Sequence, residues 1–133
     1  MSQQMTVAFP GGRRVTAHYD GFAIETDQGP DSGGGGTAPE PYDLFLASLA
    51  TCAGDSVLRV CSERGLPLDG LKVVQSWQRD ERKRISRISL QIEVPPEFPV
   101  KYHSALVRAA DICAVKRTLL DPPEITTETV VRT

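Results

Sequence analysis

The chain has 133 residues and a formal net charge of −2 at pH 7; 40% of the residues are hydrophobic and 24% are charged, which are ordinary globular values. This length predicts a single domain over residues 1–133, large enough to bury a core without disulfides or metals. The near-neutral charge gives no reason to expect a nucleic acid or an anionic membrane as partner. We expect no membrane-spanning segment and no secretory signal, so the cytoplasm is the expected compartment.

The N-terminal part of the chain predicts three short strands. Apolar and polar side chains alternate in each, and turn residues separate them, which is typical of an antiparallel meander. The strands cover residues 5–9, 14–19 and 22–26. Residues 28–41 form a Gly- and Pro-rich segment without the spacing of a phosphate-binding loop, and we interpret it as a mobile connector.

Residues 42–64 predict a long helix. Pro41 suits its first turn, Asp43 suits its positive N-terminal end, and Gly65 suits its stop. Residues 44–54 are apolar or small on nearly every side, which predicts a helix that is buried all round. Because a single small domain rarely encloses a helix completely, we expect a second copy of the chain to cover it in a homodimer.

The rest of the chain alternates between hairpin and helix patterns. Two strands surround a basic turn, and Ile88, Leu90 and Ile92 fall on one face of the second strand. Helical spacing follows, then a Pro-rich stop and a last alternating stretch. The predicted strands cover residues 71–78, 85–94 and 125–131, and the predicted helices cover residues 101–112 and 114–120. Helices mixed with antiparallel strands make the predicted fold class α+β.

Three cysteines are too few for a disulfide scaffold, but their spacing limits which of them can pair. Cys52 and Cys61 lie on one predicted helix, about 13 Å apart along its axis and on opposite faces. A disulfide needs Cα atoms within about 7 Å. Any disulfide within the chain must therefore use Cys113, with either Cys52 or Cys61, and sequence spacing does not choose between them.

The surroundings of two cysteines carry a family resemblance. Residues 41–54 (PYDLFLASLATCAG) resemble the first-cysteine helix of the OsmC/Ohr family, the osmotically induced and organic-hydroperoxide-resistance proteins. Residues 109–119 (AADICAVKRTL) resemble the second-cysteine segment of that family. The order of elements and the 61 positions between Cys52 and Cys113 also fit. The resemblance implies an OsmC-like fold, in which antiparallel sheets and central helices form an intertwined homodimer.

The resemblance also implies an activity, a thiol-dependent peroxidase that reduces organic, and in some members inorganic, hydroperoxides. Cys52 would attack the hydroperoxide and become a sulfenic acid, and Cys113 would condense with it to a disulfide. An external dithiol would then reduce that disulfide, and no cofactor or metal would take part. Cys61 matches neither motif, and we expect it to be a core residue.

Thiol chemistry of this kind needs a cation, because an ordinary cysteine with a pKa of about 8.5 is mostly protonated at pH 7. One guanidinium about 4 Å away would contribute about 4 kcal/mol at an effective dielectric near 20, before desolvation. Gly11-Gly12-Arg13 resembles the early loop that carries the arginine in the hydroperoxide-resistance branch. We therefore expect Arg13 to be this cation, with the adjacent Arg14 as the alternative.

The sequence departs from the family pattern at several positions. The Glu that pairs with the arginine in that branch has no match, since Tyr42 stands in its place with Glu40 and Asp43 nearby. Ala114 follows the second cysteine where the family usually has Pro, and Ala53 follows the first where Phe or Thr is common.

Two other interpretations of the same residues remain open. Cys52 on its own could be a small buried hydrophobe, and the fold could serve as a non-catalytic dimer that binds a small hydrophobic ligand. Phe45, Leu46 and Leu49 could line the pocket for such a ligand or for an organic peroxide. His18 and His103 lack metal-ligand spacing, so we expect no metal site.

Overall fold

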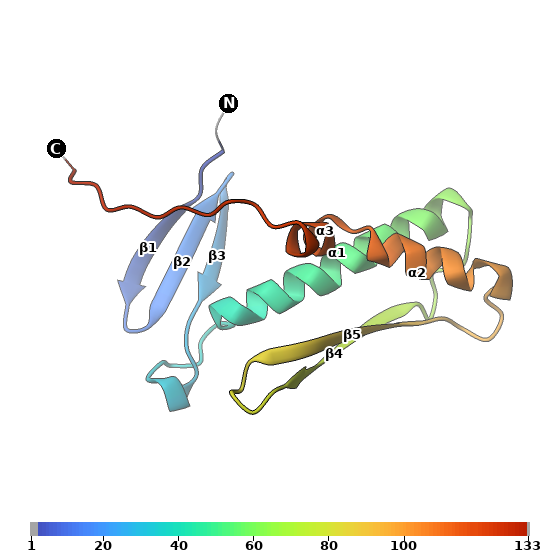
Figure 1. The fold of residues 1–133 in the computed structure, drawn as a ribbon, viewed down its shortest axis with the longest axis horizontal. Helices are drawn as coiled ribbons and strands as arrows, with labels where there is room; N and C mark the ends of the chain where they lie inside the picture. The colour runs from blue at the N-terminus through green and yellow to red at the C-terminus, as the bar shows by residue number, and fades with distance from the viewer. Residues whose placement is uncertain (1–2, 133) are drawn as a thin grey trace. The chain divides into compact units, whose positions relative to one another are not determined.

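The computed structural model of the protein describes residues 3–132 and has the predicted α+β architecture (Figure 1). It contains two small antiparallel sheets and three α-helices among the described residues. The chain forms two compact units, of which the first ends at Ala47 and the second begins at Ser48. Each unit contains one of the sheets.

The sheet of the first unit is the predicted three-stranded meander. Strands β1 (Thr6–Gly11), β2 (Arg14–Tyr19) and β3 (Phe22–Thr26) are antiparallel in the order β1-β2-β3. The β2–β3 turn is two residues long, and Asp20 and Gly21 both have positive φ, at 50° and 81°. This geometry matches the right-handed twist of the flanking strands and explains why an Asp-Gly pair stands there.

The segment between β3 and the long helix has more internal order than the sequence predicted. It contains a short 3-10 helix, η1 (Pro30–Ser32), and several backbone hydrogen bonds close its turns. Gly34 is required at its position, because a Cβ there would collide with the Gln28 carbonyl group. Gly34 therefore allows close packing of the backbone and does not indicate a mobile segment.

Helix α1 (Pro41–Glu63) begins and ends with standard capping interactions. At its start, the Glu40 N–H donates to Asp43 Oδ2 at 3.0 Å, which is one of the two contacts of a capping box. At its end, Gly65 has a φ of 63° and the Leu66 N–H donates to the Cys61 carbonyl at 2.9 Å. This is the Schellman geometry that a glycine after a helix favours, as the sequence predicted.

Only one face of α1 is buried by the chain itself, although the sequence predicted burial all round. The opposite face includes Thr51 and Leu58, and Leu58 is 45% exposed. The buried residues follow a spacing of three or four, and they are Leu46, Leu49, Ala53, Val57 and Cys61. Within the described residues, the exposed side of α1 is thus of mixed character, because Leu58 lies beside the exposed Asp55–Arg59 ion pair.

We expected no membrane-spanning segment, yet α1 is long and apolar enough to cross a membrane by length and composition alone, with a mean hydropathy of 1.4. It is the one such helix among residues 3–132. A single helix of this kind is weak evidence, because the core helix of a soluble protein passes the same test. Asp43 and Asp55 also lie within this helix, and acidic residues disfavour the hydrocarbon region.

In the second unit a hairpin and two short helices pack against the buried face of α1 (Figure 1). Strands β4 (Lys72–Arg79) and β5 (Ile85–Glu93) form the predicted antiparallel hairpin. The first turn of the predicted helix over residues 101–112 is a 3-10 helix, η2 (Val100–Tyr102), and α2 (His103–Asp111) continues from it. Helix α3 (Ala114–Leu120) follows as predicted.

Two small hydrophobic clusters hold α1 against these elements. In one of them, Val57 and Cys61 of α1 pack with Phe98 and with Leu106 of α2. In the other, Leu49 and Ala53 of α1 pack with Cys113. The predicted inner face of β5 covers both clusters: Ile88 and Leu90 lie on the second, and Ile92 and Val94 lie on the first.

The predicted closing strand over residues 125–131 is wrong for the single chain, which has no regular secondary structure after α3 in the described residues. The alternating side chains are present, but Ile125, Val130 and Val131 are 83%, 75% and 88% exposed. A strand forms only when a neighbouring strand pairs with its N–H and C=O groups, and no strand among residues 3–132 pairs with this segment.

The core of the second unit makes a direct stability prediction. Leu106 is 1% exposed at the centre of the first cluster, so Leu106→Ala should lower the free energy of unfolding by about 2–5 kcal/mol, the usual cost of a core cavity. Leu68→Ala is the matched control, because Leu68 is 45% exposed and should cost less than about 1 kcal/mol. Urea unfolding followed by circular dichroism measures both, and equal losses would contradict this assignment of the core.

Candidate functional site

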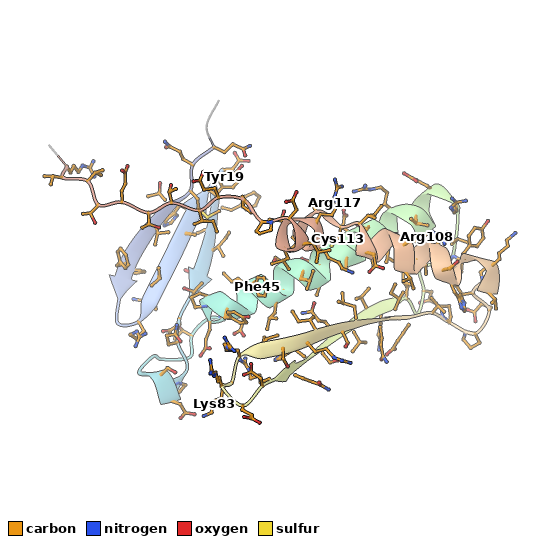
Figure 2. The ribbon with its side chains drawn as sticks, in the orientation of Figure 1. Tyr19, Phe45, Lys83, Arg108, Cys113 and Arg117 are labelled. Carbon is orange, nitrogen blue, oxygen red and sulfur yellow. The ribbon has the colours of Figure 1, made fainter. Side chains whose placement is uncertain are left out.

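The structure brings two of the three predicted site residues together. Cys113 is 2% exposed and packs with Leu49 and Ala53 of α1, and the half-buried Cys52 packs against the same cluster. Figure 2 shows Cys113 at the junction of α2 and α3, beside α1. Cys61 belongs to the other cluster. Cys52 and Cys113 therefore lie at one cluster and Cys61 lies at the other, which favours Cys52 among the two partners that the spacing left open for Cys113.

The corner between α2 and α3 determines where Cys113 lies. Helix α2 ends at Asp111, and Cys113 is the extended N-cap residue of α3, with φ −65° and ψ 149°. Its N–H donates to the Ala110 carbonyl at 3.4 Å, and its carbonyl accepts a bond from the Arg117 N–H at 3.0 Å. Hydrogen bonds thus hold both backbone groups of Cys113, and its side chain packs against Leu49 and Ala53 of α1.

Cys61 is the core residue that the sequence predicted. It is fully buried between Val57, Phe98 and Leu106, and burial raises the pKa of its thiol. Desolvation disfavours the thiolate, which is the reactive form, so this cysteine is chemically inert in the folded protein.

Two adjoining cavities flank the cysteine cluster. One, of about 200 Å³, has an apolar wall that includes Leu49, Ala53 and Ala110, residues that also form or contact the cluster. The other, of about 320 Å³, shares Leu49 and Leu90 with the first and includes Ile88. Both are lined by residues of the second unit, and both can hold the apolar part of a small organic molecule.

Lys116 lies at the junction of these cavities and lines both of them. Its ammonium group pairs with Asp111 Oδ1 at 2.6 Å, and Arg87 also lines the larger cavity. The sequence analysis did not single out Lys116, although it stands one helical turn after Cys113. That spacing on a helix was the available signal.

The predicted cation, Arg13, lies in the first unit, in the turn between β1 and β2. Its Nη1 donates a hydrogen bond to the Ser32 carbonyl at 3.0 Å, so η1 holds the guanidinium. The alternative, Arg14, lines a separate cavity of about 200 Å³ together with Glu25 and Thr37. Of the two arginines, Arg13 is therefore the one with a defined backbone partner.

The two acids near Tyr42 serve the start of α1 and the loop before it. Glu40 Oε2 accepts a hydrogen bond from the Gly29 N–H at 3.1 Å, and Asp43 caps the helix as described above. Tyr42 itself packs against Phe45, with ring centroids 5.2 Å apart. These contacts give Glu40 and Asp43 a local structural role.

The most tightly bound charged group of the first unit is Asp27, which the sequence analysis did not identify. It is 2% exposed, and its Oδ2 accepts bonds from the Thr37 hydroxyl at 2.7 Å and the Thr37 N–H at 3.1 Å. Its Oδ1 accepts the Gln28 N–H at 2.8 Å. The Thr37 hydroxyl and then the backbone N–H groups, including that of Gly35, lower the pKa of Asp27 to about 2, against the opposing effect of burial.

A polar residue at the end of an alternating strand, directly before a glycine-rich segment, was the only signal for Asp27 in the sequence.

In the part of the chain that the structure describes, no group of three or more His, Cys, Asp or Glu side chains could hold a metal ion.

Comparisons with known proteins give the family. Residues 33–128 match the family model described as OsmC-like protein, and this segment contains both Cys52 and Cys113. The match spans most of the chain, and the chain therefore belongs to the OsmC-like family. The resemblance noted in the sequence is thus confirmed at the level of the family. A search of curated proteins finds no significant match.

Solved structures show the same fold. A protein from Psychrobacter arcticus assigned to osmotic stress and detoxification has a TM-score of 0.74 and 22% identity, over 89% of this chain and 88% of that one. An OsmC-like protein from Mycoplasma pneumoniae has a TM-score of 0.68 and 16% identity, over 92% and 89%. An organic hydroperoxide resistance protein from Legionella pneumophila has a TM-score of 0.55 and 20% identity, over 87% and 88%. At these identities the likeness shows the fold alone.

The pKa of Asp27 predicts an acid-sensitive first unit. Because the pKa is lower in the folded protein than the ordinary value of 3.8, the carboxylate contributes stability above about pH 4. That contribution is lost as the pH falls toward 2. The Asp27→Asn variant should therefore be less stable than the wild type at pH 7 and should lose less stability on acidification.

Thermal unfolding between pH 7 and pH 2 measures this difference. Asp31→Asn is the control, because Asp31 is an exposed acid in the same loop and its removal changes the net charge by the same amount. Parallel melting curves for the wild type and Asp27→Asn over this range would contradict the assignment.

Proposed function

We propose that the protein is a cytoplasmic, thiol-dependent peroxidase that reduces organic hydroperoxides through Cys52 and Cys113. The observation that carries this proposal is the packing of both cysteines in one cluster, beside cavities with apolar walls. The OsmC-like family and the hydroperoxide-resistance protein of the same fold support a redox or hydroperoxide-resistance role in general. Free thiols can persist in the cytoplasm, where reducing conditions prevail.

The reaction needs one hydroperoxide and one dithiol per cycle. The Cys52 thiolate attacks the outer oxygen of the hydroperoxide, the O–O bond breaks, and the alcohol leaves after taking up a proton. Cys52 is then a sulfenic acid. The Cys113 sulfur attacks the Cys52 sulfur, which forms the disulfide and releases water, and the external dithiol reduces this disulfide and is itself oxidised.

The proposed roles of the two cysteines fit their surroundings. Cys52 is half-buried, which leaves it within reach of a substrate, whereas Cys113 is buried and fixed by its backbone. A resolving thiol must wait beside the reactive one without reacting first, and burial favours that order. Arg13 is the proposed cation for the Cys52 thiolate, on the resemblance of its loop to that of the hydroperoxide-resistance branch.

Replacing each cysteine separately tests this assignment. Cys52→Ser should reduce the consumption of an organic hydroperoxide in the presence of a dithiol to background, because no thiolate remains to attack the peroxide. In the absence of dithiol, Cys113→Ser should consume about one peroxide per chain and then accumulate the sulfenic acid on Cys52, since the resolving thiol is missing. Peroxide consumption and mass spectrometry with a sulfenic-acid trap measure the two effects.

Cys61→Ala is the matched control and should leave peroxide consumption unchanged, because Cys61 lies in the other cluster. Full activity in the Cys52→Ser variant, or both cysteines unmodified after peroxide treatment of the wild type, would contradict the peroxidase proposal.

A second candidate function is the binding of a small hydrophobic ligand without catalysis. The cavity of about 200 Å³ beside the cluster, with the Lys116–Asp111 pair among its lining residues, favours this candidate. The family Glu that has no match in this sequence also favours it. Native mass spectrometry distinguishes the two functions: a copurifying ligand together with no peroxide turnover supports the binder.

We also propose that the protein is an intertwined homodimer. Leu58 of α1 is exposed in the described chain beside the Asp55–Arg59 ion pair, and the tail after α3 (residues 121–132) carries exposed apolar residues in an alternating pattern. A second copy can satisfy both features, because it can cover the helix and pair its sheet edge with the tail.

The tail gives the test of this assembly. The double variant I125E/V131E places charges on one side of the tail and should shift the protein from dimer toward monomer in size-exclusion chromatography with light scattering. T126E adds a charge on the other side and is the matched control, which should remain dimeric. A wild-type protein that is monomeric at micromolar concentration would overturn the dimer proposal.

A further inference from the structure

We propose that Asp27 is a positioning residue for Arg13: its carboxylate fixes the loop over residues 28–37, and this loop presents the Ser32 carbonyl that orients the Arg13 guanidinium. The inference rests on the proposed role of Arg13 as the cation beside the reactive thiol, and it adds a residue that acts through that cation. All of the contacts that carry it lie within the first unit.

The first step is the set of hydrogen bonds by which Asp27 holds the loop. Oδ1 accepts the Gln28 N–H at 2.8 Å, and Oδ2 accepts both the hydroxyl and the N–H of Thr37, at 2.7 and 3.1 Å. The Asp27 N–H in turn donates to the Pro39 carbonyl at 3.1 Å. One buried residue thus holds the two ends of a loop of about ten residues, and Thr37 donates to the carboxylate through both its N–H and its hydroxyl.

The second step leads from the ends of the loop to η1. The Gly36 N–H donates to the Gln28 carbonyl at 3.0 Å, while the Ser32 and Gly34 N–H groups donate to the Gly29 carbonyl at 2.9 and 3.0 Å. The Gly29 N–H is held by Glu40 Oε2. Consecutive bonds therefore fix the backbone from Asp27 to Ser32.

The third step joins η1 to Arg13. Arg13 Nη1 donates to the Ser32 carbonyl at 3.0 Å, and this is the hydrogen bond that locates the guanidinium in the first unit. A carbonyl orients a guanidinium without neutralising its charge, whereas a carboxylate partner would do both. The arrangement therefore holds a cation in place and leaves its charge available.

The carboxylate of Asp27 cannot be replaced by an isosteric amide. Every group that faces its two oxygens is a donor, and the NH₂ group of an amide would face donors on one side and leave them unsatisfied. The Asp27→Asn variant is therefore expected to loosen the loop and, through Ser32, to displace Arg13.

The test compares the reactivity of Cys52 in the Asp27→Asn, Arg13→Ala and double variants of the full-length protein. Iodoacetamide alkylation of the Cys52 peptide, followed by mass spectrometry as a function of pH, reports the thiolate directly. We expect Asp27→Asn to raise the pH midpoint by about one unit and to lower the alkylation rate at pH 7 about tenfold, in the same direction as Arg13→Ala. In the Arg13→Ala background, Asp27→Asn should add nothing further.

Two further variants keep the test decisive. Asp31→Asn, the exposed acid of the same loop, should leave the midpoint unchanged. Thr37→Val removes one donor and keeps the backbone ones, so it should fold and produce a smaller shift in the same direction if Asp27→Asn proves too unstable to study. Asp27→Glu need not restore the wild-type midpoint, because its longer side chain moves the carboxylate away from the donors of Gln28 and Thr37.

The possible outcomes separate this inference from the proposed function. If Arg13→Ala does not move the midpoint, the proposed role of Arg13 is wrong and the inference falls with it. If Arg13→Ala moves the midpoint but Asp27→Asn and Thr37→Val do not, or if the effects of Asp27 and Arg13 add, only the positioning role of Asp27 is overturned.

Discussion

The packing of Cys113 onto the side of α1 is the contact on which the proposed thiol chemistry depends. Two short helices meet at a corner whose backbone hydrogen bonds hold the Cys113 main chain, and its side chain packs with Leu49 and Ala53 of α1. Helix α1 supplies the other side of this contact. Ala53, next to Cys52, is small enough to let the α2–α3 corner approach the helix. A larger residue at that position would separate the two elements that carry the thiols.

Much of the fold follows from local patterns in the sequence. Strands β1 to β5 and helices α1 to α3 were predicted within about two residues, because alternation, helical spacing and turn residues agree in each of them. The location of Cys113 at the same cluster as Cys52 could not be obtained in this way. Helix geometry excluded Cys61 as a partner of Cys52, but only the α2–α3 corner determines which face of α1 Cys113 reaches.

Other features depend on interactions that a single sequence does not display. The closing strand over residues 125–131 has the right alternation, but a strand exists only with a partner, and no described strand of the chain pairs with it. Asp27 escaped notice because its importance lies in the donors around it, which come from Gln28, Gly35 and Thr37. Composition likewise predicted that α1 is buried all round, whereas the chain covers one face.

The complete burial of Cys61 determines when its thiol can react with an oxidant. In the unfolded chain its thiol is as accessible as the other two, and any oxidant present could join it to Cys113. Folding withdraws it into the core around Phe98 and leaves the other two cysteines as the proposed pair. A molecule that unfolds while an oxidant is present therefore risks a crosslink through Cys61 that cooling alone would not reverse.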